Sequence, residues 1–136
     1  MAEVKVERIL GPAQRAVFKG LRTSNVRVLG KFEYKRLAIT LRHRGTIVGG
    51  LVGEVYLGWM FVAALCVADD FRDKGFGSKI MKAAEKEARR RGVRNVYVDT
   101  FSFQAPGFYK KLGYREFGRL KSFPAGHHQS WLTKAV

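Results

Sequence analysis

The sequence predicts a mixed α/β (α+β) fold, in which a central mixed β-sheet is flanked by helices on both faces. Two observations support this prediction. The apolar segment Trp59–Val67 is typical of a central strand buried on both faces. The clearest amphipathic helix, Gly77–Arg91, separates that segment from the next predicted strand. A strand, a helix and another strand in this order favour a parallel pair joined by a crossover helix.

Before the apolar segment, the side-chain pattern predicts a strand, a helix and a β-hairpin. Residues 4–9 alternate apolar and charged side chains at first, as an edge strand does. Pro12 suits the start of a helix that we expect to end near Arg22, and residues 23–35 have no clear pattern. The two strands of the hairpin and the turn between them are expected at residues 37–42, 46–57 and 43–45.

The amphipathic helix 77–91 has its apolar side chains on one face, while its charged side chains, Glu85 included, point elsewhere. Gly92 is suited to cap its C-terminus. The expected apolar face consists of Ile80, Met81, Ala84 and Ala88. The remaining elements are a strand, a short helix and two final strands, expected at residues 95–100, 106–112, 114–118 and 129–134.

Composition favours one folded domain spanning residues 1–136. Hydrophobic residues make up 46% of the chain, which is enough for a core. The single cysteine, Cys66, excludes an intrachain disulfide framework and fits a reducing cytoplasm. The N-terminus lacks a signal-peptide pattern, and no apolar stretch approaches the roughly 20 residues of a membrane span. We therefore expect a cytoplasmic protein without a membrane segment.

The chain is strongly basic, with a formal net charge of +15 from 26 basic and 11 acidic residues. Such a field attracts anions, which include phosphorylated cofactors, nucleic acids and acidic proteins. It does not choose among them. The chain has no nucleic-acid-binding motif of known spacing, and the run Arg89–Arg91 is more typical of a solvated helix end.

The segment that opens the amphipathic helix predicts a phosphate site. It reads Arg72-x-x-Gly75-x-Gly77, and its glycines let backbone N–H groups come close to a ligand. The helix N-terminus adds a partial positive charge. The segment is not a Rossmann fingerprint, which needs a third glycine where Ile80 stands. It is not a P-loop either, because Ser78 precedes the lysine.

Two motifs, in this order, resemble those of the GNAT superfamily of N-acetyltransferases. Arg72-x-x-Gly75-x-Gly77 is similar to the pyrophosphate-binding motif of that superfamily. Phe108-Tyr109-x-x-Leu112-Gly113-Tyr114 is similar to its later helix signature, and the resemblance covers about residues 37–134. It implies the GNAT fold with a splayed fourth and fifth strand, acetyl-CoA as cosubstrate, and no metal.

The resemblance also implies which residues bind the cofactor. The pantetheine arm would pair with the fourth strand, and the pyrophosphate would lie on backbone N–H groups of the glycine loop. We favour Cys66 as a small apolar side chain over an acetyl-carrying nucleophile. The implied cofactor-binding residues are Leu65, Cys66, Val67, Arg72, Asp73, Lys74, Gly75, Phe76, Gly77, Ser78, Thr100, Phe108 and Tyr109.

The implied chemistry is direct attack of an amine on the thioester. Tyr109 occupies the position of the general acid of many relatives. Many relatives also have a carboxylate within the fourth strand, but the corresponding stretch, residues 61–64, contains none. The general base therefore stays open between Glu54 acting through water, one of the loop histidines His127 and His128, and bulk water.

The acceptor is expected to be an amine of a small molecule or a protein, bound between residues 12–35 and the hairpin around residues 54–59. The basic N-terminal segment disfavours polycations and favours an amine beside acidic groups. Most of the nearby aromatic side chains are expected to belong to the core. They are Trp59, Phe61, Phe101 and Phe103. The alternative functions are a non-catalytic acyl-CoA-binding protein and a polyanion- or nucleic-acid-binding protein on the same scaffold. Relatives are often dimers, so a homodimer is left open.

Overall fold

The computed structural model describes all 136 residues, in two units that are treated separately, residues 1–33 and 34–136. The first unit contains one helix, α1 (Leu10–Leu29). The predicted helix is confirmed but is longer at both ends. Pro12 lies in its first turn, where a backbone N–H has no helical acceptor to lose. The strand predicted at residues 4–9 is wrong, because the segment has no neighbouring strand to pair with.

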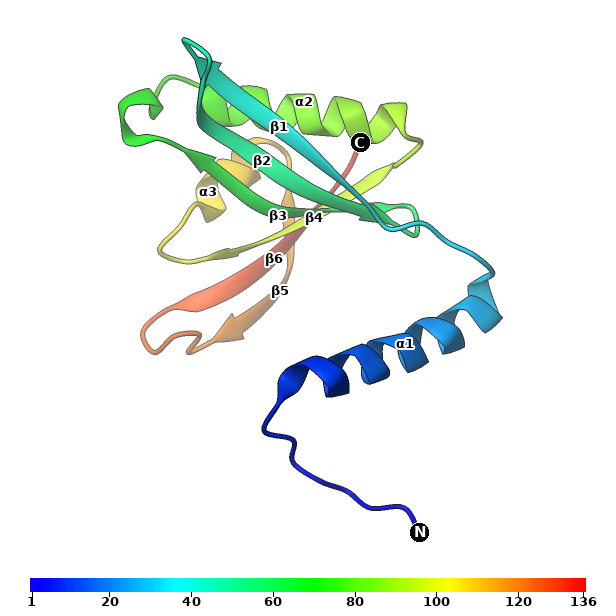
Figure 1. Cartoon of the computed structure of the whole chain (residues 1–136). Helices are drawn as coiled ribbons and strands as arrows, with labels where there is room; N and C mark the ends of the chain where they lie inside the picture. Colours follow the sequence, from blue (N-terminus) through cyan, green and yellow to red (C-terminus); the bar gives the residue numbers. More distant parts are fainter. The chain divides into compact units, whose positions relative to one another are not determined.

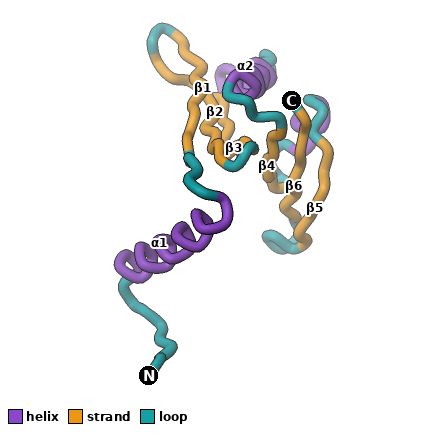
Figure 2. Tube along the Cα trace, turned by 90° about the vertical axis from the view of Figure 1, so that its right-hand side faces the viewer, coloured by secondary structure: helices purple, strands orange, loops and turns teal.

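The second unit is a six-stranded sheet with two helices (Figure 1). The strand order is β1-β2-β3-β4-β6-β5, and Figure 2 shows the strands in this order from one edge to the other. Only β3 and β4 pair in parallel. This confirms the predicted mixed α/β fold, although α2 and α3 of this unit lie on the same face of the sheet. The elements are β1 (Lys35–His43), β2 (Thr46–Tyr56), β3 (Trp59–Val67), α2 (Phe76–Arg90), β4 (Asn95–Phe101), α3 (Pro106–Lys111), β5 (Arg115–Lys121) and β6 (His128–Ala135).

The core lies between the sheet and α2, which runs along one face of the sheet (Figure 1). The predicted apolar face of this helix is buried, with no side chain more than 4% exposed. Glu85 departs from the prediction because it is buried as well. It accepts hydrogen bonds from the Tyr114 hydroxyl at 2.7 Å and from Lys134 Nζ at 3.0 Å. A buried carboxylate is stable there because both partners compensate its lost hydration.

The parallel strands β3 and β4 separate part-way along their length. Their pairing starts at Trp59 opposite Asn95 and stops at Val62 opposite Val98, although both strands continue. The predicted splay is therefore confirmed, between the third and fourth strands because no strand precedes β1. The predicted burial of β3 on both faces is wrong. Only Met60 and Val62 are buried, since the residues beyond them border a gap instead of a neighbouring strand.

Cys66 illustrates the same effect. The sequence placed it in a buried apolar strand, but its side chain is exposed. No helix of the chain has both the length and the apolar character needed to cross a lipid bilayer.

Candidate active site

Two cavities meet along the gap between β3 and β4. The first has a volume of about 550 Å³ and lies at the N-terminus of α2. The second has a volume of about 370 Å³ and lies between the separated strand ends. Because some residues line both cavities, the two form one channel. The shared residues are Leu65, Gln104, Ala105 and Phe108.

The loop at the first cavity leaves backbone donors without partners. Gly75 is the N-cap of α2, has no side chain that could cap the helix, and adopts a φ of 81°. The first backbone hydrogen bond of the helix joins Lys79 N to Gly75 O at 3.2 Å. The N–H groups of residues 76–78 therefore have no helical acceptor. With the helix dipole, they make an anion-binding site.

Arg72 and Gly77 shape this cavity in ways that the motif alone did not indicate. Arg72 Nε donates to Val67 O at 2.8 Å, and its Nη1 lies 3.3 Å from Asp69 Oδ1, so the side chain braces the loop against β3. A Cβ atom on Gly77 would lie 3.2 Å from the Phe108 ring. Glycine is needed there for close packing between α2 and α3, in addition to any ligand.

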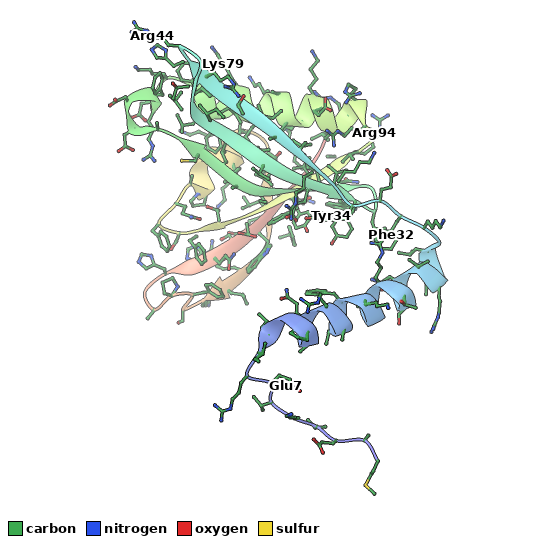
Figure 3. The ribbon with its side chains drawn as sticks, in the orientation of Figure 1. Glu7, Phe32, Tyr34, Arg44, Lys79 and Arg94 are labelled. Carbon is green, nitrogen blue, oxygen red and sulfur yellow. The ribbon has the colours of Figure 1, made fainter.

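Most of the predicted cofactor-binding residues line the channel, but Cys66 and Lys74 do not. Lys74 Nζ instead donates to Asp70 O at 3.1 Å. Lys79 projects from the first turn of α2 and adds positive charge near the N-terminus of this helix (Figure 3). Sequence reasoning missed three residues that line the first cavity. Two of them precede the second GNAT-like motif by a few residues, which was a usable signal, and the third precedes the glycine loop. They are Gln104, Ala105 and Phe71.

Tyr109 brings a phenol to the second cavity. The residue is only 6% exposed, and its ring packs against Phe108 and Tyr114 at centroid distances of 5.1 and 5.9 Å. Burial, and after it the carboxylate of Asp99, raises the pKa of Tyr109 to about 12. The phenol is therefore protonated throughout the neutral range and is available as a donor.

None of the predicted general bases lines either cavity. Glu54, on β2, faces Arg36 across one strand pair. His127 Nδ1 lies 3.1 Å from Ser102 Oγ, and its ring meets Phe103 edge-on at 5.0 Å. His128 begins β6 opposite Lys121. The structure thus does not bring these side chains to Tyr109.

The aromatic side chains near the site are less buried than predicted. Trp59 and Phe103 are 41% and 56% exposed, while Phe61 and Phe101 are half-buried. Only Phe101 lines the channel. The prediction that most of these rings belong to the core is therefore wrong. They lie on the sheet face opposite α2, where the second unit has no helix of its own.

The acidic side chain that lines the second cavity is Asp99. It follows Val98, the last residue of β4 that pairs with β3. Sequence reasoning missed it because one aspartate near a strand end is not distinctive. Its position is distinctive only in the tertiary structure, where the two strands separate beside it. The chain contains no cluster of three or more side chains that could hold a metal ion.

Comparison with known proteins gives consistent matches. A family model described as an acetyltransferase (GNAT) domain matches residues 34–116. An acetyltransferase of Agrobacterium fabrum is 33% identical over 123 residues, which is 90% of each chain. The blasticidin-S acetyltransferase of Streptomyces morookaense is 40% identical over 94 residues, 68% of this chain and 69% of that protein. The crystal structure of an acetyltransferase from Bacillus cereus has a TM-score of 0.91 at 30% identity and covers 98% of both chains.

Proposed function

Because the chain belongs to the GNAT acetyltransferase family, we propose that it binds acetyl-CoA along the channel and transfers the acetyl group directly to an amine. The acceptor is the amine of a small molecule or a protein. One observation carries this proposal. A buried, protonated tyrosine stands where the two strands separate, at the end of a channel that begins at an uncapped helix N-terminus.

The channel fits the cosubstrate in two respects. The free N–H groups of residues 76–78 suit a pyrophosphate, which Gly75 and Gly77 let approach closely. Beyond Val62, β3 has no partner on the β4 side, so its backbone groups are free to hydrogen-bond the amides of pantetheine. Cys66 and Lys74 enter this proposal only through their backbone. Leu65, Thr100 and Phe108 supply side walls.

The proposed catalytic roles follow from what the thioester reaction needs. A backbone N–H of β3 near Leu65 stabilises the negative charge that develops on the carbonyl oxygen. Tyr109 donates a proton to the departing sulfur, and its raised pKa keeps that proton in place at neutral pH. Glu54 lies outside the channel, so as a base it would act through water. This role remains a proposal.

Tyr109→Phe tests the acid, with Tyr114→Phe as the matched control. Tyr114 is the neighbouring buried phenol, but its hydroxyl serves Glu85 instead of the channel. Turnover would be screened with primary amines that include tyramine, spermidine and blasticidin S, the last because one relative bears its name. We expect Tyr109→Phe to lower kcat about 100-fold without weakening acetyl-CoA binding. Tyr114→Phe should lower the unfolding temperature and leave kcat within about threefold.

Three results would count against parts of this proposal. An unchanged kcat in Tyr109→Phe would remove the tyrosine as acid. Tight acetyl-CoA binding without turnover of any amine would favour a non-catalytic acyl-CoA-binding protein. If acetyl-CoA bound no better than ATP and both weakened together with salt, a polyanion-binding function would explain the charge better.

A further inference from the structure

The channel opens on two sides of the sheet. In β4 the buried side chains of Val96, Val98 and Thr100 alternate with half-buried ones at positions 97, 99 and 101. The buried valines pack in the core beneath α2, so Asp99 points toward the opposite face. In contrast, α3 lies next to α2, because Phe108 borders Gly77. Tyr109 and Asp99 therefore approach the gap from opposite faces.

The carboxylate of Asp99 has no cationic partner in the structure. No hydrogen bond or ion pair of this side chain is found in the chain, whereas Glu54 has Arg36 as its register partner. Two phenols lie near Asp99: Tyr97 on the same strand and Tyr109 on α3. The pKa of each phenol is raised, mainly by burial and to a smaller extent by the Asp99 carboxylate. Ala63 and Ala64 lie across the gap and Trp131 lies opposite on β6, and none of these three side chains titrates. An unpaired carboxylate in a cavity attracts a cation.

An aromatic surface begins beside Asp99. Phe61 and Tyr97 are register partners whose rings stack at a centroid distance of 4.8 Å, and Trp59 meets Tyr97 edge-on at 6.0 Å. Tyr34 projects on the side of the sheet away from α2 (Figure 3), where it packs against Tyr56 at 5.5 Å. Half-exposed rings of this kind bind a planar, apolar group by stacking.

We propose that the acceptor is a primary amine on a planar, apolar body, that Asp99 binds its ammonium group and accepts one proton, and that the body lies on Phe61 and Tyr97. The inference rests on the proposed function and adds the acceptor class and the base. It also explains how a chain of net charge +15 binds a cation, since the charge at this opening is local.

One proton passes from the ammonium nitrogen to the Asp99 carboxylate, which leaves a nitrogen lone pair. That pair forms the N–C bond to the acetyl carbonyl carbon, and the C–S bond breaks. Tyr109 gives its proton to the sulfur and regains one from the acetylated nitrogen. Asp99 then releases its proton to solvent, so each turnover yields an amide, free CoA and one proton.

Binding can be tested without acetyl-CoA by using two probes that differ in one group. Tyramine has an ammonium group where tyrosol has a hydroxyl on the same phenylethyl body. We expect chemical-shift titrations of the wild-type chain to show at least about tenfold tighter binding of tyramine, and Asp99→Asn to abolish that preference. Glu116→Gln makes the same change in net charge outside the channel, on β5, and should keep the preference.

Turnover gives a second readout with any amine that is acetylated. Asp99→Asn should lower kcat/KM for the amine about 100-fold, Asp99→Glu should restore part of it, and acetyl-CoA affinity should stay within about twofold in both. The inference is overturned if the wild type binds tyrosol as well as tyramine, if Asp99→Asn keeps the preference or the rate, or if Glu54→Gln causes the loss instead. Failure of acetyl-CoA to bind would defeat the proposed function but leave the tyramine preference standing, so the two failures are distinguishable.

Discussion

The two ends of the channel are built in different ways. The proposed cofactor end consists of backbone N–H groups and glycines from one continuous stretch, residues 72–78. The proposed acceptor end combines side chains from separate elements, Asp99 on β4 and Tyr109 on α3 in the channel and Phe61 on β3 outside it. Backbone donors are present whichever neutral side chains occupy the loop, whereas side chains from separate elements can change one at a time. In the proposed function, the cosubstrate site is therefore less sensitive to side-chain substitution than the acceptor site.

The largest effect is expected where α2 is anchored behind the cofactor end. Glu85→Ala leaves the Tyr114 hydroxyl and the Lys134 ammonium without their buried partner, and should lower the free energy of unfolding by about 3 kcal/mol. Chemical denaturation would measure it. Glu87→Ala, on the same helix but bonded only to exposed Arg90 and Arg91, serves as the control and should lower the stability far less. Equal losses would mean that the buried network does not anchor α2.

Ser78→Glu tests the cofactor end of the channel independently of the acceptor end. A carboxylate in the first turn of α2 favours the helix but repels a pyrophosphate at the same N–H groups. We expect calorimetry to show acetyl-CoA binding weakened about 50-fold, with unchanged or higher thermal stability. The neutral Ser78→Gln has nearly the same size and should weaken binding only a few-fold. Similar losses in both variants would point to steric obstruction instead of charge.

Phe61→Leu should affect the acceptor end alone. It removes the ring that stacks on Tyr97 while keeping an apolar side chain. We expect the KM for an aromatic amine to rise about fivefold and acetyl-CoA affinity to stay unchanged. Phe117→Leu, an equally aromatic position on β5 outside the channel, is the control. A matching change in acetyl-CoA affinity would show that the two ends are not independent.

Alkaline pH offers the finest test of the acceptor end. The pKa of Tyr109 is about 12 in the folded chain against 10.0 for an unperturbed tyrosine, so the folded state holds this proton more tightly. Its contribution to stability is complete below pH 10 and is lost as the pH rises toward 12, by about 1 kcal/mol at pH 11. Denaturation at pH 8 and pH 11 should show a smaller difference for Tyr109→Phe than for wild type. An identical difference would mean that the phenol is not buried.

Local patterns predicted the parts of the fold that depend on neighbours in sequence. The hairpin, the amphipathic helix and the glycine loop were all identified from their own residues, because turns, periodicity and helix starts are short-range features. The same reasoning predicted a strand at residues 4–9 that does not form, since a strand needs a partner that its own sequence cannot supply. One domain across all 136 residues stays a prediction, as do the cytoplasmic location and the homodimer.

The sequence by itself determined the family, the glycine loop and the candidate acid, because each is carried by a contiguous motif whose backbone chemistry is local. Tertiary structure decided the rest. The early end of β3–β4 pairing exposes Cys66 and turns an apolar strand into a channel wall. It also gives Asp99 an open cavity, while Glu85, which has a similar side chain, is sealed by Tyr114 and Lys134. The two carboxylates differ in what surrounds them, and a carboxylate's surroundings come from strands and helices distant in sequence.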